Sequence, residues 1–213
     1  MRNPETGSSN LPPAILFVSD SMYQPSILTE EEGNELLVIA RAALEKFVRN
    51  EQATKPEKYA IKFNEQYGIF CNLLKGGETR SRAVVGLPYP VVSVIDAVMA
   101  AVISASHEDL RFTRVLPNEL SDIKIELSIL TAPQKIDSTS DAKMLNSIIP
   151  GTDGLMLSYG MYEAFLPPQA WNTIKDKESF LNTLCDQAGL EADAWHDSEI
   201  QLYKFQAQIF AED

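Results

Sequence analysis

The chain has 213 residues, and 18 Lys and Arg against 30 Asp and Glu give it a formal net charge of −12. Hydrophobic residues make up 45% and charged residues 23%, which is ordinary for a globular protein and excludes collagen-like, coiled-coil and wholly disordered chains. Because so negative a surface repels phosphate groups, the composition also argues against a nucleic-acid partner.

The N-terminal part of the sequence indicates a tail followed by a single domain. Residues 1–13 are rich in Asn, Ser, Gly and Pro, a composition typical of loose segments. The apolar run over 14–18 is shorter than a membrane span or a signal-peptide core, and we expect it to be retained as an added edge strand. We therefore predict a tail over 1–28, a domain over 29–213, no membrane association and a cytoplasmic location.

The first half of the sequence predicts two helices around a β-hairpin. Thr29 and Glu32 form a capping-box pattern, and apolar residues then recur every three or four positions. Gly76-Gly77 suits the tight turn of a hairpin. In the second helix we expect Val91 to be among the buried side chains. The predicted elements are a helix over 29–50, strands over 68–74 and 79–87, and a helix over 91–106.

The second half predicts further strands and helices. Apolar residues alternate with Lys124, Glu126 and Ser128, which predicts a strand with one buried face and one solvated face. Because most strands come in hairpins with helices between them, we predict an α+β fold with an antiparallel sheet and packed helices. The predicted elements are a strand over 122–130, a helix over 142–149, strands over 154–159 and 161–166, a helix over 177–188 and a final strand over 200–210.

Three short segments carry a resemblance to a known family. They read D-L-R-F at 109–112, L-T-A-P at 130–133 and P-G-T-D-G-L at 150–155. With the elements around them, they are similar to the AMMECR domain family, over roughly 29–210. The resemblance implies a larger and a smaller subdomain with a cleft between them. Members of this family are often encoded or fused with a Memo-type protein and a radical-SAM protein, which implies a shared pathway and makes these proteins candidate partners.

The hallmark of this family, a six-residue L-R-G-C-I-G segment, is altered in the present sequence. The corresponding residues 81–86 read S-R-A-V-V-G, so Arg82 and Gly86 match while Val84 replaces the cysteine. Valine has no nucleophile, no transferable proton and no affinity for metals, so the chemistry of that cysteine is absent here. Cys71 lies on the predicted neighbouring strand, but it is not a like-for-like substitute.

Arginines in the two signature segments suggest a site for an anion. We hypothesise that Arg82 and Arg111 converge on one cleft and bind a carboxylate or a phosphate, because guanidinium is always charged and binds both in bidentate fashion. The alternative is that they pair with acidic side chains, which we favour for Arg80 and Arg114. The acidic candidates are Asp96, Glu108, Asp109 and Glu126.

Gly86, Cys71 and His107 complete the candidate ligand site. His107 ends the second predicted helix, where it is either a general base or, more simply, a cation that favours the helix dipole. The two cysteines and two histidines are widely spread, so neither a disulfide framework nor a zinc site is expected. No nucleotide-binding or nucleophile-elbow motif is present, and we predict no metal and no cofactor.

Tyr159 and Tyr162 lie around Gly160 in the second hairpin and are candidates for contact with a partner protein. The alternative is that Tyr162 and Trp171 close the core of the smaller subdomain. Because Val84 removes the reactive position, we predict a non-catalytic binding or adaptor domain with an anion-accepting cleft. Its partner is an unknown protein or a second copy paired through hairpin edges. The alternative function is an enzyme, or a substrate-handling partner of one, in a pathway associated with Memo-type and radical-SAM proteins.

Overall fold

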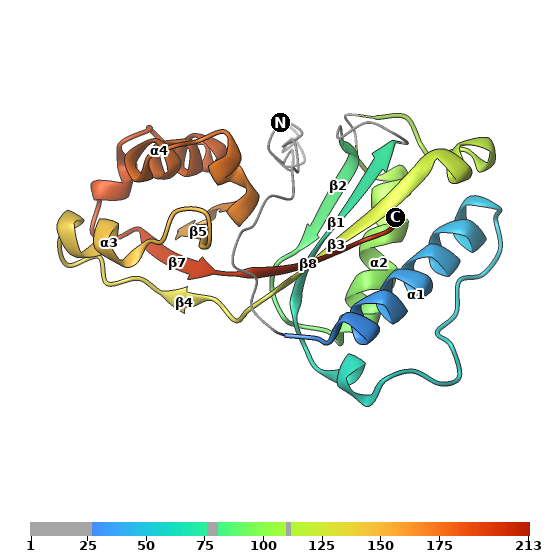
Figure 1. The fold of residues 1–213 in the computed structure, drawn as a ribbon. Helices are drawn as coiled ribbons and strands as arrows, with labels where there is room; N and C mark the ends of the chain where they lie inside the picture. The colour runs from blue at the N-terminus through green and yellow to red at the C-terminus, as the bar shows by residue number, and fades with distance from the viewer. Residues whose placement is uncertain (1–26, 76–80, 110–111) are drawn as a thin grey trace, which may run out of the picture.

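A computed structural model gives the fold and describes residues 27–75, 81–109 and 112–213 (Figure 1). The predicted tail and edge strand before residue 27 and the predicted Gly76-Gly77 turn lie outside these ranges. Within the described residues, helices pack on two four-stranded antiparallel sheets, which confirms the predicted α+β class. None of the helices in these ranges is both long enough and apolar enough to cross a lipid bilayer.

The elements follow the predicted order closely. In chain order they are α1 (Glu30–Val48), η1 (Ile61–Asn64), β1 (Gly68–Lys75), β2 (Ser81–Leu87), α2 (Val94–His107), η2 (Pro117–Asp122), β3 (Ile123–Leu130), β4 (Gln134–Lys135), α3 (Asp141–Ser147), β5 (Gly154–Tyr159), β6 (Tyr162–Leu166), η3 (Pro168–Asn172), α4 (Lys177–Ala188), η4 (Ala194–His196), β7 (Gln201–Phe205) and β8 (Ala207–Ala211), where η denotes a 3-10 helix.

The larger subdomain is built on the first sheet, whose strand order is β2-β1-β3-β8, with α1 and α2 on one face. We call this the helix face. The predicted capping box at the start of α1 is confirmed: Thr29 Oγ1 accepts from Glu32 N at 3.2 Å, and a carboxylate oxygen of Glu32 accepts from Thr29 N at 2.8 Å. Alternate residues of the central strands, such as Ile69 and Ile125, are fully buried against the helices.

The prediction that Val91 is buried is wrong, because α2 begins later than the apolar pattern suggests. Ser93 caps the helix with its side chain, and Val94 is the first helical residue. Val91 therefore lies in the connection from β2, where 72% of it is exposed. The residues predicted to be buried further along, including Val98 and Val102, are in the core.

The smaller subdomain is built on the second sheet, whose strand order is β4-β7-β5-β6. One face of this sheet packs against α3 and α4, and its core holds Trp171, which stacks on Phe180 at 4.0 Å between ring centroids. The helix α4 ends at Gly189, as predicted, and its φ of 77° explains the glycine.

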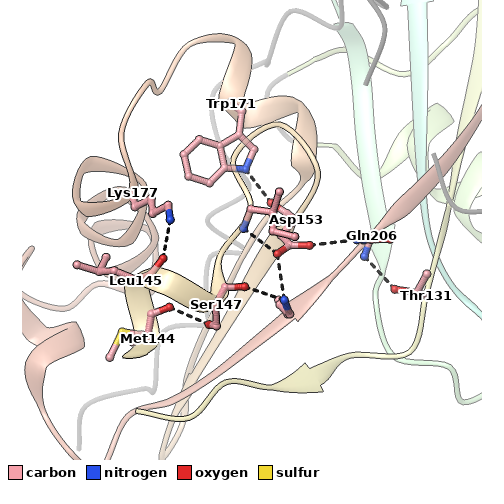
Figure 2. A network of polar contacts seen from close by, with 10 residues as sticks. Thr131, Met144, Leu145, Ser147, Asp153, Trp171, Lys177 and Gln206 are labelled. Atoms are coloured by element: carbon pink, nitrogen blue, oxygen red, sulfur yellow. Dashed lines mark hydrogen bonds and ion pairs between the residues drawn. The ribbon is translucent and has the colours of Figure 1, made fainter. Parts of the chain in front are cut away.

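Two neighbouring stretches of chain join the subdomains (Figure 1). One leads from β3 to β4 and the other from β7 to β8. The predicted single strand over 200–210 is wrong, because Gln206 separates β7 in the second sheet from β8 in the first. At this crossing Thr131 N donates to Gln206 O at 2.8 Å, and Gln206 N donates to Thr131 Oγ1 at 2.9 Å (Figure 2).

Apolar contacts also hold the two subdomains together. They form a junction cluster of buried residues, Leu130, Met156, Phe205 and Ala207. Phe70 packs against this cluster from the larger subdomain, and Phe165 from the smaller one. The cleft expected between the subdomains stays a prediction.

Candidate functional site

The altered hallmark segment lies on β2, and its valine faces a row of polar residues. Val84 is the register partner of Asn72 on β1, and Asn72 is in turn the partner of Glu126 on β3. Their strand neighbours Ala83 and Cys71 are fully buried on the helix face. Because side chains alternate along a strand, the row points to the opposite face, which we call the outer face of the first sheet.

Glu126 is a buried carboxyl in this row. It is 8% exposed, and burial raises its pKa to about 7, against the lowering effect of a hydrogen bond from Asn72. That bond, from Asn72 Nδ2 to a carboxylate oxygen, is 3.5 Å long. The sequence predicted that Glu126 and Ser128 face solvent, and this is wrong, since both are buried on the outer face.

The polar row continues across the subdomain boundary. Ser128 lies two residues after Glu126 on the same face of β3, and its Oγ accepts from Gln169 Nε2 at 3.4 Å. Gln169 belongs to η3 of the smaller subdomain. We call Asn72, Glu126, Ser128 and Gln169 the polar seam.

Two oxygens of the polar seam have no hydrogen-bond partner among the described residues. They are Asn72 Oδ1 and Gln169 Oε1, and each residue is only 2% exposed. Leaving such a group unpaired in the interior costs about 1–3 kcal/mol. A bound hydrogen-bond donor would therefore be stabilised at the seam.

The two signature segments meet through a backbone contact. Asp109, from the D-L-R-F segment, is buried, and its Oδ2 accepts from Val84 N at 3.1 Å. In the described residues β2 is an edge strand, so no further strand pairs with its outer side. The Asp109 carboxylate supplies the acceptor for the Val84 amide that a neighbouring strand would otherwise supply. Asp109 thus fixes the segment after α2 to the altered hallmark.

Arg82 is directed away from the row by an irregularity in β2. The register runs from Leu73 opposite Ala83 to Leu74 opposite Ser81, so Arg82 is the extra residue of a β-bulge. Its Nη2 donates to Thr113 O at 2.6 Å. The guanidinium also lies 3.8 Å from a Glu119 carboxylate oxygen and 5.5 Å from the Phe112 ring centre.

These contacts match the interpretation in which the arginine pairs with an acidic residue, although Glu119 was not among the predicted partners. Arg111 and Arg80 lie outside the described residues, and Arg114 is exposed. An anion site shared by Arg82 and Arg111 stays a prediction.

The structure does not bring Cys71 and His107 to the outer face. Cys71 is sealed on the helix face, where burial raises the pKa of its thiol. His107 packs on Phe47 of α1 at 4.8 Å between ring centroids, and its Nδ1 lies 2.8 Å from Ile103 O. The groups that sequence reasoning placed in one site are therefore divided between two faces of the sheet.

Gly86 remains beside Val84 on the same strand, but its surroundings indicate packing. It is the register partner of Phe70, and a Cβ at this position would lie 2.3 Å from Phe70 Cε1. The aromatic ring fills the space that a side chain or a ligand would need.

The two candidate tyrosines of the second hairpin differ in how far they are exposed to solvent. Tyr159 packs against the core of the smaller subdomain, whereas Tyr162 is 49% exposed, and the two rings stack at 6.4 Å between centroids. Met161 at the tip is 96% exposed, next to Gly160 with a φ of 61°. The core-closing interpretation is confirmed for Trp171, which is buried in that core, and is wrong for Tyr162, which is exposed.

Asp153 was missed by sequence reasoning, although its segment carried the resemblance. Its carboxylate is almost completely buried and accepts from Ile149 N at 2.9 Å and from Gln206 Nε2 at 3.2 Å. Lys204 Nζ lies 3.4 Å from the same carboxylate. The Asp153 carbonyl accepts from Trp171 Nε1 at 2.7 Å, so the residue ties the second hairpin to the crossing strands (Figure 2).

Asn72 and Gln169 were also missed. Asn72 interrupts the otherwise apolar strand G-I-F-C-N-L-L, and a lone amide in such a run was the signal that could have found it. Gln169 follows Pro167-Pro168 in what reads as a turn, so nothing in the sequence marks it as buried.

Comparison with known proteins identifies the family. A sequence profile of the AMMECR1 family matches residues 37–210. The chain belongs to the AMMECR1 family. A protein of Methanothermobacter thermautotrophicus is 40% identical to it, over 90% of this chain and 98% of its own length.

A further relative matches over a similar length, and a solved structure has the same fold. Protein MJ0810 of Methanocaldococcus jannaschii is 37% identical, over 87% of this chain and 92% of its own. The crystal structure of the uncharacterized protein PH0010 from Pyrococcus horikoshii superimposes with a TM-score of 0.83 at 31% identity, over 88% of this chain and 94% of its own.

Proposed function

We propose that this AMMECR1-family protein is a non-catalytic binding or adaptor domain that docks a protein partner through the tip of the β5–β6 hairpin. The observation that carries the proposal is the exposure of Met161 and Tyr162 at that tip. Aromatic and Met side chains are enriched in protein interfaces. A Met side chain at 96% exposure has nearly all of its apolar surface available for burial by a partner.

The hairpin holds these side chains in a fixed arrangement. Ala164 and Leu166 on β6 are buried under α4, and Tyr159 anchors the other strand in the same core. A pair of strands fixed in this way loses little conformational freedom on binding, which favours affinity.

The arrangement of the reactive candidates supports a role without chemistry of its own. Val84 stands on the outer face, and the nearest strand cysteine, Cys71, is sealed on the other face of the sheet. His107 is held between α1 and the carbonyl of its own helix. The contact partners of Arg82 likewise suit an arginine that positions the segment after α2.

The partner class follows from the family resemblance. A Memo-type protein and a radical-SAM protein are the first partners to test, and a second copy of the chain is the alternative occupant of the hairpin. All three contacts would bury the same apolar tip.

The test is binding of the purified chain to purified Memo-type and radical-SAM proteins, with oligomeric state measured by light scattering. Met161→Ser and Tyr162→Ala are expected to weaken the contact by about tenfold or more each, in line with interface anchors of about 1.4 kcal/mol. Ile61→Ser is the matched control, because Ile61 is an exposed apolar residue in the larger subdomain, at 88% exposure. Equal loss in the control and the hairpin variants would reject the hairpin as the docking surface.

The alternative function, an enzyme or a substrate-handling partner, is favoured by one observation. Burial raises the pKa of Glu126 to about 7 beside Asn72, with β1 between its strand and that of the hallmark position, and such a carboxyl can exchange protons near neutral pH. A turnover in the presence of Memo-type and radical-SAM proteins that Glu126→Gln abolishes, with the fold intact, would establish this alternative over the adaptor role.

A further inference from the structure

The polar seam between the subdomains gathers hydrogen-bond acceptors that are not matched by donors. Asn72 Oδ1 and Gln169 Oε1 are buried without a partner among the described residues, and the Glu126 carboxylate lies between them along the sheet. Buried polar atoms in native proteins nearly always have a partner, either in the protein or in something bound to it. These two oxygens could therefore accept hydrogen bonds from an N–H or O–H donor that lies outside the described part of the chain.

The contacts inside the seam are too long to satisfy it. The Asn72–Glu126 and Gln169–Ser128 distances are 3.5 and 3.4 Å, beyond the usual range of about 2.7–3.2 Å for an N–H···O bond. Both amide groups are thus only loosely engaged, and their oxygens accept no hydrogen bond from the described residues. A carboxylate and two amide oxygens disfavour an anion and favour a group with several N–H donors.

The residues beside the seam are apolar. Val84 is the register partner of Asn72, and Phe70 is the register partner of Ser128. The junction cluster continues this apolar lining towards the smaller subdomain. A ligand with a short hydrocarbon body behind a polar head matches both parts.

We propose that the polar seam binds a small molecule or side chain that carries a primary ammonium or primary amide group, with its N–H donors on Asn72, Glu126 and Gln169 and its hydrocarbon part against Val84 and Phe70. Gln169 comes from the smaller subdomain and the other contacts from the larger one. A bound ligand would therefore bridge the two subdomains. This ligand site is independent of the hairpin tip proposed for partner docking.

The test uses probes of matched size with the whole chain at pH 8: ethylammonium chloride, propionamide and sodium propionate, followed by saturation-transfer NMR. For probes this small, dissociation constants of about 1 mM or weaker are expected. We expect ethylammonium and propionamide to bind and propionate not to bind.

Two variants locate the binding. Glu126→Gln is expected to weaken ethylammonium by about tenfold or more, because a charge-assisted hydrogen bond is lost, while propionamide changes little. Gln169→Leu is expected to weaken both probes. Glu199→Gln makes the same chemical change as Glu126→Gln at an exposed position and is expected to leave both affinities unchanged.

Three results would overturn the proposal: no binding of either donor probe, propionate binding as well as ethylammonium, or wild-type affinities in both seam variants. Probe selectivity of the wild-type chain decides the question even where a variant folds poorly. Loss of partner docking in the hairpin variants would leave these results unaffected, so the two proposals fail separately.

Discussion

The ring of Phe70 lies against the Cα of Gly86 on the neighbouring strand, in the place where any other residue would carry its Cβ. We predict that Gly86→Ala destabilises the protein by about 1–3 kcal/mol, because the ring must move within a packed junction. Urea denaturation measures the effect. Phe70→Leu in the same chain should recover part of the loss, whereas an undisturbed Gly86→Ala protein would contradict the packing role.

Glu126 should make stability depend on pH in a direction opposite to that of most carboxyls. Its pKa is raised to about 7 in the folded state from 4.5, so the folded protein binds the proton more tightly than the unfolded chain does. Stability then falls as pH rises through the window from about 4.5 to 7, by about 3 kcal/mol at most.

The variant Glu126→Gln isolates this contribution. It should be more stable than the wild type at pH 8 and nearly equal to it at pH 5, as measured by urea denaturation at both values. Glu199→Gln, at an exposed site, serves as the reference. A wild-type advantage that grows with pH would mean that the charged form of Glu126 has a partner.

Arg41 and Glu212 fasten the C-terminal strand to α1. Arg41 Nε donates to Glu212 Oε1 at 2.9 Å, a second guanidinium nitrogen contacts Oε2, and Oε2 also accepts from Ile125 N at 2.8 Å. We predict that Glu212→Ala costs about 1–3 kcal/mol of unfolding free energy.

A double-mutant cycle tests this pair. Arg41 also donates to the carbonyls of Leu120 and Ile123, so Arg41→Ala should cost more than Glu212→Ala. The double variant should cost less than the sum of the two. Strict additivity would show that the contact contributes nothing to stability.

The variant Val84→Cys restores the hallmark cysteine and tests whether the side chain at position 84 is accessible on the outer face of the first sheet. In Val84→Cys the new thiol is half-buried on the outer face, whereas Cys71 and Cys185 are buried and have raised pKa values, about 11 for Cys185. We expect alkylation of position 84 in the native state at a rate well above that of the two natural thiols, with a stability change of about 1 kcal/mol or less. Mass spectrometry of the labelled peptides identifies the site. Equal protection of all three thiols would place Val84 in a sealed interior.

The sequence predicted elements whose signals are local. The capping box of Thr29 and the glycine after α4 are set by neighbouring residues, and both are found where expected. The polar face of β3 was misjudged because alternation shows which side chains share a face, but not what covers that face. Glu126 is buried by contacts that come from elsewhere in the chain.

The candidate site was predictable in its segments but not in its geometry. Resemblance located the segments that contain Val84, Asp109 and Asp153, yet pairing across strands decides which of these residues meet. The β-bulge at Arg82 arises from a shift in the pairing of β1 with β2, and no sequence signal near Arg82 predicts an extra residue there. Likewise, Gln206 reads as one more strand residue, although the chain changes sheets there.

The adjacency of Thr131 and Gln206 has a consequence for how the two subdomains are arranged along the chain. The chain enters and leaves the segment from β4 to β7 at neighbouring residues, so the smaller subdomain is an insertion between β3 and β8 of the larger one. Shortening or exchanging that insertion would not require rethreading α1, α2 or the sheet beneath them. Changes in the length or sequence of the smaller subdomain are therefore compatible with an unchanged first sheet.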